Sequence, residues 1–311
     1  MLNPALLVMP AAIWASLVVV GVNVMVDVGP VTLSWVTWLL GAVVLLALST
    51  AALRRDRRIL LAELPVLAFS AFTGVALFQA LWFAGLLVAN PANVAILTAT
   101  LPVIIAVLAA VTLGERLNRT QLIGVLLTLA SALWIGASGD LQQLARVRIG
   151  RGELMILLAN VSMAAYTVAL KRWPTRLEPT PFMAAVAALG AFMLFPAAWL
   201  EGGLGSGTAP IVQHLVAIAY IGVFASALAY VMWNQSVARN GASITGLVLY
   251  TQPAFALAFC RVFLGQPVLP YHWTGLALLA AGVMLVSRTG AATPRTGPAA
   301  AERTDQHRPA L

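Results

Sequence analysis

Long apolar runs separated by short polar stretches make up most of this 311-residue chain. Each run has about 20 residues, the length that an α-helix needs to cross a hydrocarbon core of ~30 Å. Residues 289–311 are instead rich in Pro, Thr, Arg and acidic side chains, which is typical of a disordered tail. The pattern predicts an all-α polytopic membrane protein with ten transmembrane helices, at residues 5–26, 31–50, 64–88, 92–113, 121–138, 152–170, 181–200, 211–237, 243–264 and 272–287.

The second half of this pattern repeats the first at a constant spacing and without a gap. The spacing that carries Pro102 onto Pro253 also pairs Trp82 with Trp233, Thr100 with Thr251, Leu113-Gly114 with Leu264-Gly265, and Gly124 with Gly275. We therefore expect two five-helix repeats, residues 1–140 and 150–288. Because five crossings are an odd number, the second repeat should be inverted relative to the first, an arrangement that recurs in secondary transporters.

Composition supports a membrane protein and argues against a nucleic-acid partner. The chain is 61% hydrophobic and only 9% charged, whereas an ordinary soluble domain has roughly 25% charged residues. Its net charge of +8 comes from short basic clusters between apolar runs rather than from one basic face. The single cysteine, Cys260, lies within an apolar run, so no disulfide framework is expected.

The basic clusters also predict the orientation, because cytoplasmic loops carry an excess of Lys and Arg. With the N-terminus inside, the inner loops hold Arg54, Arg55, Arg57, Arg58, Arg116, Arg119, Lys171, Arg172, Arg176 and Arg239. The outer loops then hold Asp27, Asp140, Glu153 and Glu201, with Arg146, Arg148 and Arg151 as the exception. We expect a multi-pass protein of the plasma or inner membrane, with both termini and the tail cytoplasmic.

The middle of each predicted span contains no acidic residue. All ten acidic residues and the three histidines fall in loops, at helix ends or in the tail. A carboxylate relay that trades protons for a cation would need such a group at depth, and an intramembrane protease would need an aspartate pair or an activated nucleophile. We therefore expect no catalytic residue, no metal site and no cofactor, and the chain is not predicted to be an enzyme.

Neutral and aromatic side chains remain at membrane depth as candidates for solute contact. Unpaired amides are costly in hydrocarbon, so these groups should face one another or a wet cavity. Hydrogen bonds between helices are the alternative for the hydroxyl groups. The predicted solute-binding residues are Trp14, Gln79, Trp82, Thr98, Asn160, Tyr166, Tyr230, Trp233, Asn234 and Gln252.

Two prolines lie inside predicted spans at paired positions. Pro102 and Pro253 each remove a backbone donor, and freed backbone groups at this depth are tolerated only against protein or water. We interpret them as hinges, with simple bending for helix packing as the alternative.

These features together resemble the EamA-type transporters of the drug/metabolite transporter superfamily. The resemblance is carried by Leu113-Gly114-Glu115-Arg116, the following Gln121-Leu122-Ile123-Gly124, and the paired prolines. It implies a basket-like helical fold with a central cavity and export of amino acids or other small metabolites. Three departures are Gln266 opposite Glu115, Thr37-Trp38 where relatives often have an arginine before an aromatic residue, and Arg261.

The sequence thus predicts a secondary transporter that exports a small metabolite by alternating access. A gradient-driven facilitator or channel on the same fold is one alternative, and a non-transporting receptor or a lipid-acting enzyme is another. The expected partners are a small-molecule solute and the lipid bilayer. A monomer suffices because one chain holds both repeats, and a homodimer is left open.

Overall fold

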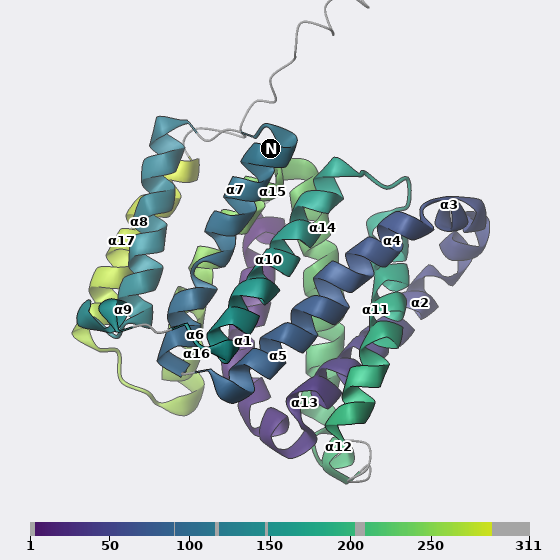
Figure 1. The fold of residues 1–311 in the computed structure, drawn as a ribbon, viewed down its shortest axis with the longest axis horizontal. Coiled ribbons are helices and arrows are strands. Elements are labelled where there is room, and N and C mark those ends of the chain that lie inside the picture. Colours follow the sequence, from purple (N-terminus) through teal and green to yellow (C-terminus); the bar gives the residue numbers. More distant parts are fainter. Residues whose placement is uncertain (1–3, 90, 116–117, 147–148, 203–208, 288–311) are drawn as a thin grey trace, which may run out of the picture.

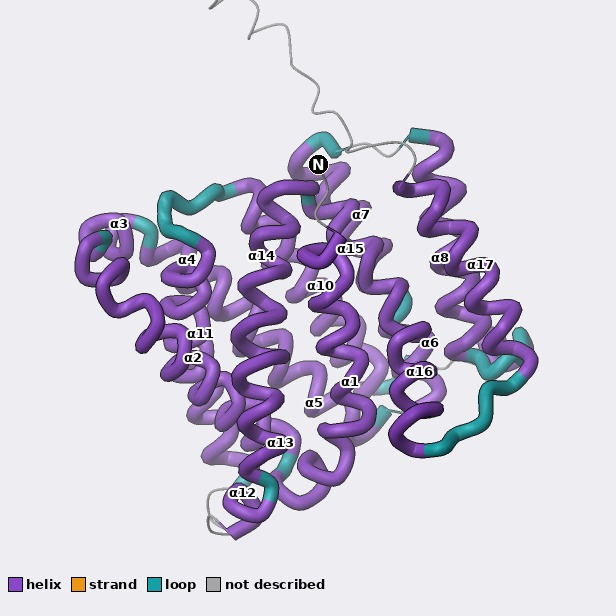
Figure 2. Tube along the Cα trace, turned by 180° about the vertical axis from the view of Figure 1, so that it is seen from behind, coloured by secondary structure: helices purple, strands orange, loops and turns teal. Residues whose placement is uncertain are grey.

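The computed structural model describes the chain except residues 1–3, 90, 116–117, 147–148, 203–208 and 288–311 (Figure 1). The predicted tail therefore lies outside the described residues. The described part consists of helices joined by loops and contains no strand (Figure 2). Its first half consists of α1 (Pro4–Val28), α2 (Pro30–Arg55), α3 (Arg57–Ala62), α4 (Leu64–Ala71), the π-helical segment η1 (Phe72–Leu77), α5 (Phe78–Val88), α6 (Pro91–Thr98), α7 (Leu101–Leu113) and α8 (Arg119–Gly136).

The second half follows the short helix α9 (Gln142–Ala145). Its longest helices, α10 and α11, lie beside elements of the first half, α10 against α5 and α7 and α11 against α2. The second half consists of α10 (Arg151–Arg172), α11 (Pro179–Glu201), α12 (Ala209–Gln213), α13 (Leu215–Tyr220), the π-helical segment η2 (Ile221–Leu228), α14 (Ala229–Asn240), α15 (Ala242–Val248), the 3₁₀ segment η3 (Leu249–Thr251), α16 (Gln252–Leu264) and α17 (Pro270–Ser287).

Several of these stretches are long and apolar enough to cross a membrane. Among the described residues there are seven: Pro30–Arg55, Leu64–Val88, Arg119–Gly136, Arg151–Arg172, Pro179–Glu201, Leu215–Asn240 and Ala242–Leu264. Leu7–Leu17 and Leu101–Leu113 are shorter apolar helices. The predicted all-α, multi-span membrane class is thus confirmed, while the number of ten spans and their inversion stay predictions.

The spans that contain Pro102 and Pro253 are both interrupted just before the proline. The sequence predicts a continuous helix over 92–113, whereas the structure ends α6 at Thr98 and starts α7 at Leu101. Pro102 and Pro253 each occupy the first turn of the following helix, α7 or α16. A proline costs little in a first turn, because that N–H has no partner within the helix.

The same two helices also end alike. Gly114 after α7 and Gly265 after α16 have φ values of 68° and 67°, a left-handed conformation that glycine adopts without steric cost.

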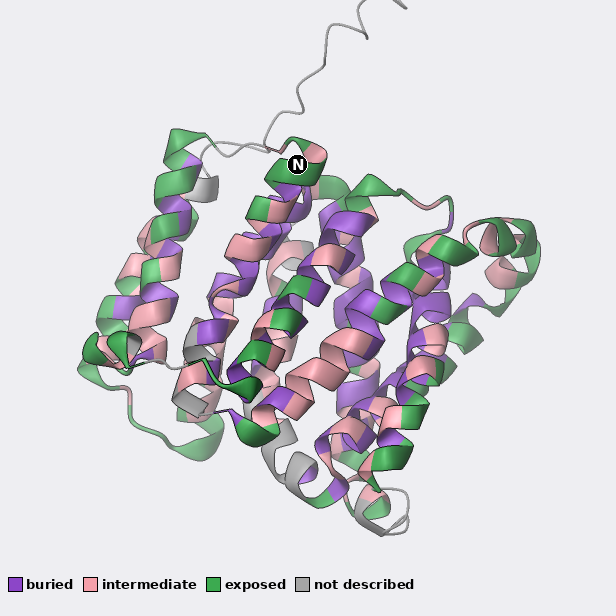
Figure 3. Cartoon of the chain, viewed as in Figure 1, coloured by how far each residue is buried: buried purple, intermediate pink, exposed green. Residues whose placement is uncertain are grey.

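Burial is greatest in the middle of the bundle and least at its edges (Figure 3). Trp38, Tyr166 and Trp233 are among the largest fully buried side chains. At one edge, α8 and α17 pack mainly against each other. A Cβ on Gly282 would lie 2.6 Å from Thr128 Cγ2, so only glycine permits this close approach.

Carboxylates tie the ends of helices to the neighbouring half of the chain. Glu201 accepts hydrogen bonds from the backbone N–H groups of Val31 (2.9 Å) and Thr32 (2.6 Å), at the start of α2. Glu115 accepts from the N–H groups of Ala242 (3.3 Å) and Ser243 (3.1 Å), at the start of α15. Acidic groups stabilise helix N-termini, whose N–H groups lack partners within the helix. These acidic residues therefore hold helix ends in place rather than entering the interior.

Candidate functional site

A cavity of about 210 Å³ lies between elements of both halves of the chain. The first half contributes residues of α1, α2, α5, α6 and α7, and the second contributes residues of α10, η2, α14, η3 and α16. Every lining side chain is uncharged. Six of the ten residues predicted from the sequence line it: Trp14, Gln79, Trp82, Thr98, Tyr230 and Gln252.

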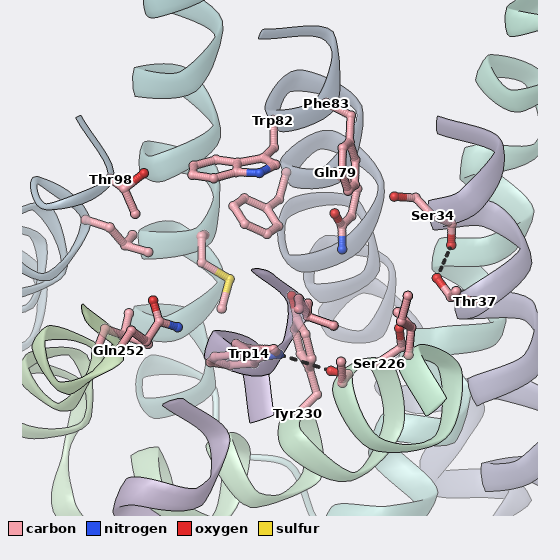
Figure 4. A pocket seen from close by; sticks show the side chains of 17 residues that line it. Trp14, Ser34, Thr37, Gln79, Trp82, Phe83, Thr98, Ser226, Tyr230 and Gln252 are labelled. Carbon is pink, nitrogen blue, oxygen red and sulfur yellow. Dashed lines mark hydrogen bonds between the residues drawn. The ribbon is translucent and has the colours of Figure 1, made fainter. Parts of the chain in front are cut away.

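Aromatic side chains form two opposite walls of the cavity. Figure 4 shows Trp82 on one side and Trp14 and Tyr230 on the other. The rings of Trp14 and Tyr230 are edge to face with centroids 5.3 Å apart, and Phe78 supports Trp82 at 5.9 Å. Such contacts restrict ring movement and add stability beyond area burial. The walls are therefore shaped before a solute arrives.

Two amide side chains point into the space between these walls. Figure 4 shows the amides of Gln79 and Gln252 facing it from opposite halves of the chain. Neither has a hydrogen-bond partner among the described residues. An amide without a partner is costly in an apolar environment, so each needs water or a solute. The cavity thus offers two donor and acceptor groups between aromatic surfaces.

Three other polar side chains of the lining are already engaged in hydrogen bonds. Trp14 Nε1 donates to the carbonyl of Ala225 (3.1 Å), and Tyr230 donates its hydroxyl to the carbonyl of Gly74 (3.2 Å). Thr98 Oγ1 donates to the carbonyl of Val94 (2.7 Å). These bonds fix Trp14, Tyr230 and Thr98. Ser34 Oγ is buried without a hydrogen-bond partner among the described residues, so it remains available beside the two amides.

The other four predicted residues lie behind the wall rather than on it. Tyr166 donates its hydroxyl to Asn234 Oδ1 at 2.6 Å, and both side chains are buried. Trp233 is buried against Trp14, with ring centroids 5.5 Å apart. Asn160 Nδ2 bonds the carbonyl of Leu97 (2.9 Å). These side chains support the lining in this structure, and their contact with solute stays a prediction.

The interruptions of the helices are held by side chains from the opposite half. A π-helical segment or a helix break leaves backbone carbonyls without their usual partners. In the first half, the carbonyl of Thr73 in η1 accepts from Ser162 Oγ (2.8 Å), and the carbonyl of Ala99 at the α6–α7 break accepts from the Tyr250 hydroxyl (3.1 Å). Asn160 and Tyr230 act similarly at Leu97 and Gly74, as described above.

The sequence did not single out several lining residues. Phe78 was detectable, because it lies four residues before Trp82 and shares its helix face. Ser226 was not, because it lies in η2, whose π-helical turn changes the face on which each residue falls. The lining residues missed were Leu17, Ser34, Thr37, Phe78, Phe83, Leu101, Met163, Ile221, Ala225, Ser226 and Leu249.

The helices long enough to span a membrane and the central cavity between them indicate a membrane transport protein, and the comparisons agree. The chain belongs to the EamA-like transporter family, whose model matches residues 3–137 and 150–288. It is 28% identical over 294 residues to the transporter YetK of Bacillus subtilis (strain 168), covering 94% of this chain and 88% of YetK. The resemblance inferred from the sequence is confirmed.

Two further similarities bear on function and fold. The chain is 31% identical over 227 residues to a protein of Streptantibioticus cattleyicolor named as a probable terminal-alkyne amino-acid exporter, covering 73% of this chain and 74% of that protein. A solved crystal structure matches with a TM-score of 0.72 at 19% identity, covering 93% of this chain and 98% of the other. The latter likeness shows the fold alone.

The hydrogen bond between Tyr166 and Asn234 should stabilise the fold. Tyr166→Phe leaves the buried Asn234 oxygen without its donor, which should cost about 1–3 kcal/mol. Adding Asn234→Leu should cost less than the sum of the two single changes, because the bond is already lost. Unfolding of the four purified proteins measures this coupling.

Tyr271→Phe is the matched control, since Tyr271 is only partly buried and its hydroxyl has no partner among the described residues. Additive effects of Tyr166→Phe and Asn234→Leu, or an equal loss in Tyr271→Phe, would contradict this assignment.

Proposed function

We propose that this protein is a secondary transporter that exports a small metabolite with an apolar part and a neutral or zwitterionic polar part. The observation that carries the proposal is the pair of unpartnered amides, Gln79 and Gln252, between the aromatic walls of an uncharged cavity. Aromatic walls suit an apolar group, and the amides suit the donors and acceptors of a small polar group. The cavity is smaller than the ~300–1,000 Å³ of drug-sized ligand sites, which favours a small solute.

Amino acids and related compounds are the proposed solute class. A carboxylate could be received by helix N-termini, because Leu101 and Gln252, the first residues of α7 and α16, both line the cavity. Such termini carry partial positive charge, and interrupted helices present them to substrates in several transporter folds. The name of the Streptantibioticus relative as an amino-acid exporter supports the same class.

The mechanism proposed is alternating access between two inverted five-helix repeats, residues 1–140 and 150–288. Paired features support it: π-helical segments at η1 and η2, helix breaks before Pro102 and Pro253, and left-handed glycines after α7 and α16. Figure 1 also supports it, since α4–α5 and α13–α14 cross the bundle in opposite directions. The positive-inside distribution supports cytoplasmic termini in a plasma or inner membrane.

A gradient-driven facilitator on the same fold is the second candidate. The uncharged lining favours it, because a solute can cross such a cavity without a charged group that must be neutralised in each cycle. Accelerated exchange of labelled solute for unlabelled solute on the opposite side supports a carrier, whereas flux that does not saturate supports a channel.

Counterflow in proteoliposomes, with a panel of labelled amino acids and related metabolites, tests the proposed site. Gln79→Leu and Gln252→Leu keep the size of the side chain but remove a hydrogen-bonding group, and each should raise KM about three- to tenfold. Trp82→Ala should weaken transport further, because it removes one aromatic wall.

Leu87→Ala is the control, since Leu87 lies on the same helix, is 65% exposed and is absent from the lining. Counterflow that is unchanged in the two glutamine variants, or lost equally in Leu87→Ala, would exclude this cavity as the solute site.

Substitution of the prolines tests separately whether the breaks before α7 and α16 move during transport. We propose that Pro102 and Pro253 keep the breaks before α7 and α16 flexible, so Pro→Ala should allow a more continuous helix and lower the maximum transport rate per folded molecule. Transport rate and the amount of monodisperse protein are measured together. A smaller folded yield with a normal rate per molecule would make the prolines structural only.

A further inference from the structure

The turn between α2 and α4 combines a surface groove with a cluster of arginines. Arg54 and Arg55 end α2, and Arg57 and Arg58 begin the short helix α3, and all four are exposed. Figure 1 shows α3 at the margin of the bundle, away from the central cavity. This feature is separate from the proposed transport site.

The carboxylates around this turn are already engaged. Arg55 forms a bidentate pair with Asp56, with both N–O distances 2.9 Å, and also lies 3.6 Å from Glu178. The hydrogen bond from Arg55 lowers the pKa of Asp56, which therefore stays ionised. Glu63 accepts hydrogen bonds from Thr175 Oγ1 and from the backbone N–H of Arg176.

Three of the four guanidinium groups have no acidic partner among the described residues, and two of them belong to Arg54 and Arg57. Within the described residues, neither Arg54 nor Arg57 forms an ion pair. An arginine can hold a phosphate by two parallel hydrogen bonds. The pair therefore presents unneutralised positive charge in a form suited to a phosphate group.

These two arginines stand at one end of an apolar groove. The hollow of about 660 Å³ is lined by Leu46, Ala47, Thr50 and Leu53 together with Arg54 and Arg57. Its floor follows one stripe of α2, because residues spaced by three or four positions share a helix face. Thr50 Oγ1 donates to the carbonyl of Leu46 (2.7 Å), so its hydroxyl needs no other partner. The stripe from Leu46 to Leu53 is about 10 Å long at 1.5 Å per residue.

We propose that this groove binds one anionic phospholipid, with its phosphate on Arg54 and Arg57 and an acyl chain along Leu46, Ala47 and Leu53. The stripe belongs to the membrane-spanning helix α2, Arg54 lies at the end of that helix, and Arg57 begins α3 directly after it. The apolar and charged parts therefore match the order of chain and headgroup in a bilayer. A free phosphate would use the arginines but leave the apolar floor empty. A zwitterionic lipid would bring an ammonium group toward the arginines, so a lipid of net negative charge is favoured.

Native mass spectrometry of the full chain in a neutral detergent tests this with phosphatidylglycerol as the probe and phosphatidylcholine as the comparison. Phosphatidylglycerol should bind with one preferred site. The double variant R54Q/R57Q should weaken that binding about fivefold for each arginine removed, the typical effect of one basic residue at an anionic surface. Ala47→Trp should also weaken it, because the indole fills the groove and leaves the charge unchanged.

The double variant R119Q/R172Q removes the same charge from exposed positions on α8 and α10, outside the groove, and should bind phosphatidylglycerol as the parent does. An equal loss in this control would overturn the proposal in favour of general electrostatic attraction. Unchanged binding in Ala47→Trp, or displacement of the lipid by glycerol phosphate, would also overturn it. Unfolding temperatures of all variants identify any that lose binding by misfolding.

Discussion

The structure depends on the need to satisfy every backbone carbonyl and amide at membrane depth. A regular helix does this within itself, but the π-helical segments and helix breaks of this chain leave carbonyls free. Side chains of the opposite half meet that need: Ser162 and Tyr230 bond carbonyls of η1, and Tyr250 bonds Ala99 at the α6–α7 break. Conversely, Trp14 in α1 of the first half donates a hydrogen bond to the carbonyl of Ala225 in η2 of the second half. The two halves are therefore joined through their irregular segments.

The same hydrogen bonds also distinguish polar side chains that are fixed in the cavity walls from those that remain available inside the cavity. Side chains that bond a freed carbonyl are fixed and form its walls, as Trp14 and Tyr230 do. Gln79 and Gln252 bond no described residue and remain available to water or solute. The same irregular segments that join the halves thus surround the proposed transport site, so a change in their packing would change the cavity directly.

Much of this arrangement was predictable from the sequence, because the relevant signals are local. Apolar run lengths indicated a helical protein with several membrane spans, and neutral polar or aromatic side chains at depth indicated six cavity residues. The features that could not be predicted depend on contacts between distant residues or on helix register. The sequence cannot show that Tyr166 bonds Asn234, which draws both behind the cavity wall. Nor does it reveal the π-helical turns that bring Ser226 to the lining, or that Pro102 lies in the first turn of a helix instead of bending one.

The most direct test of the account is the accessibility of the cavity from the two sides of the membrane. Cys260 is the only cysteine, so a Cys260→Ser background with Ser226→Cys places a single thiol in the cavity lining. A membrane-impermeant maleimide is applied to sealed vesicles of each orientation, with and without a transported solute. The account predicts labelling from either side and a change in the ratio of the two rates when solute is present. Labelling from one side only, with or without solute, would contradict it.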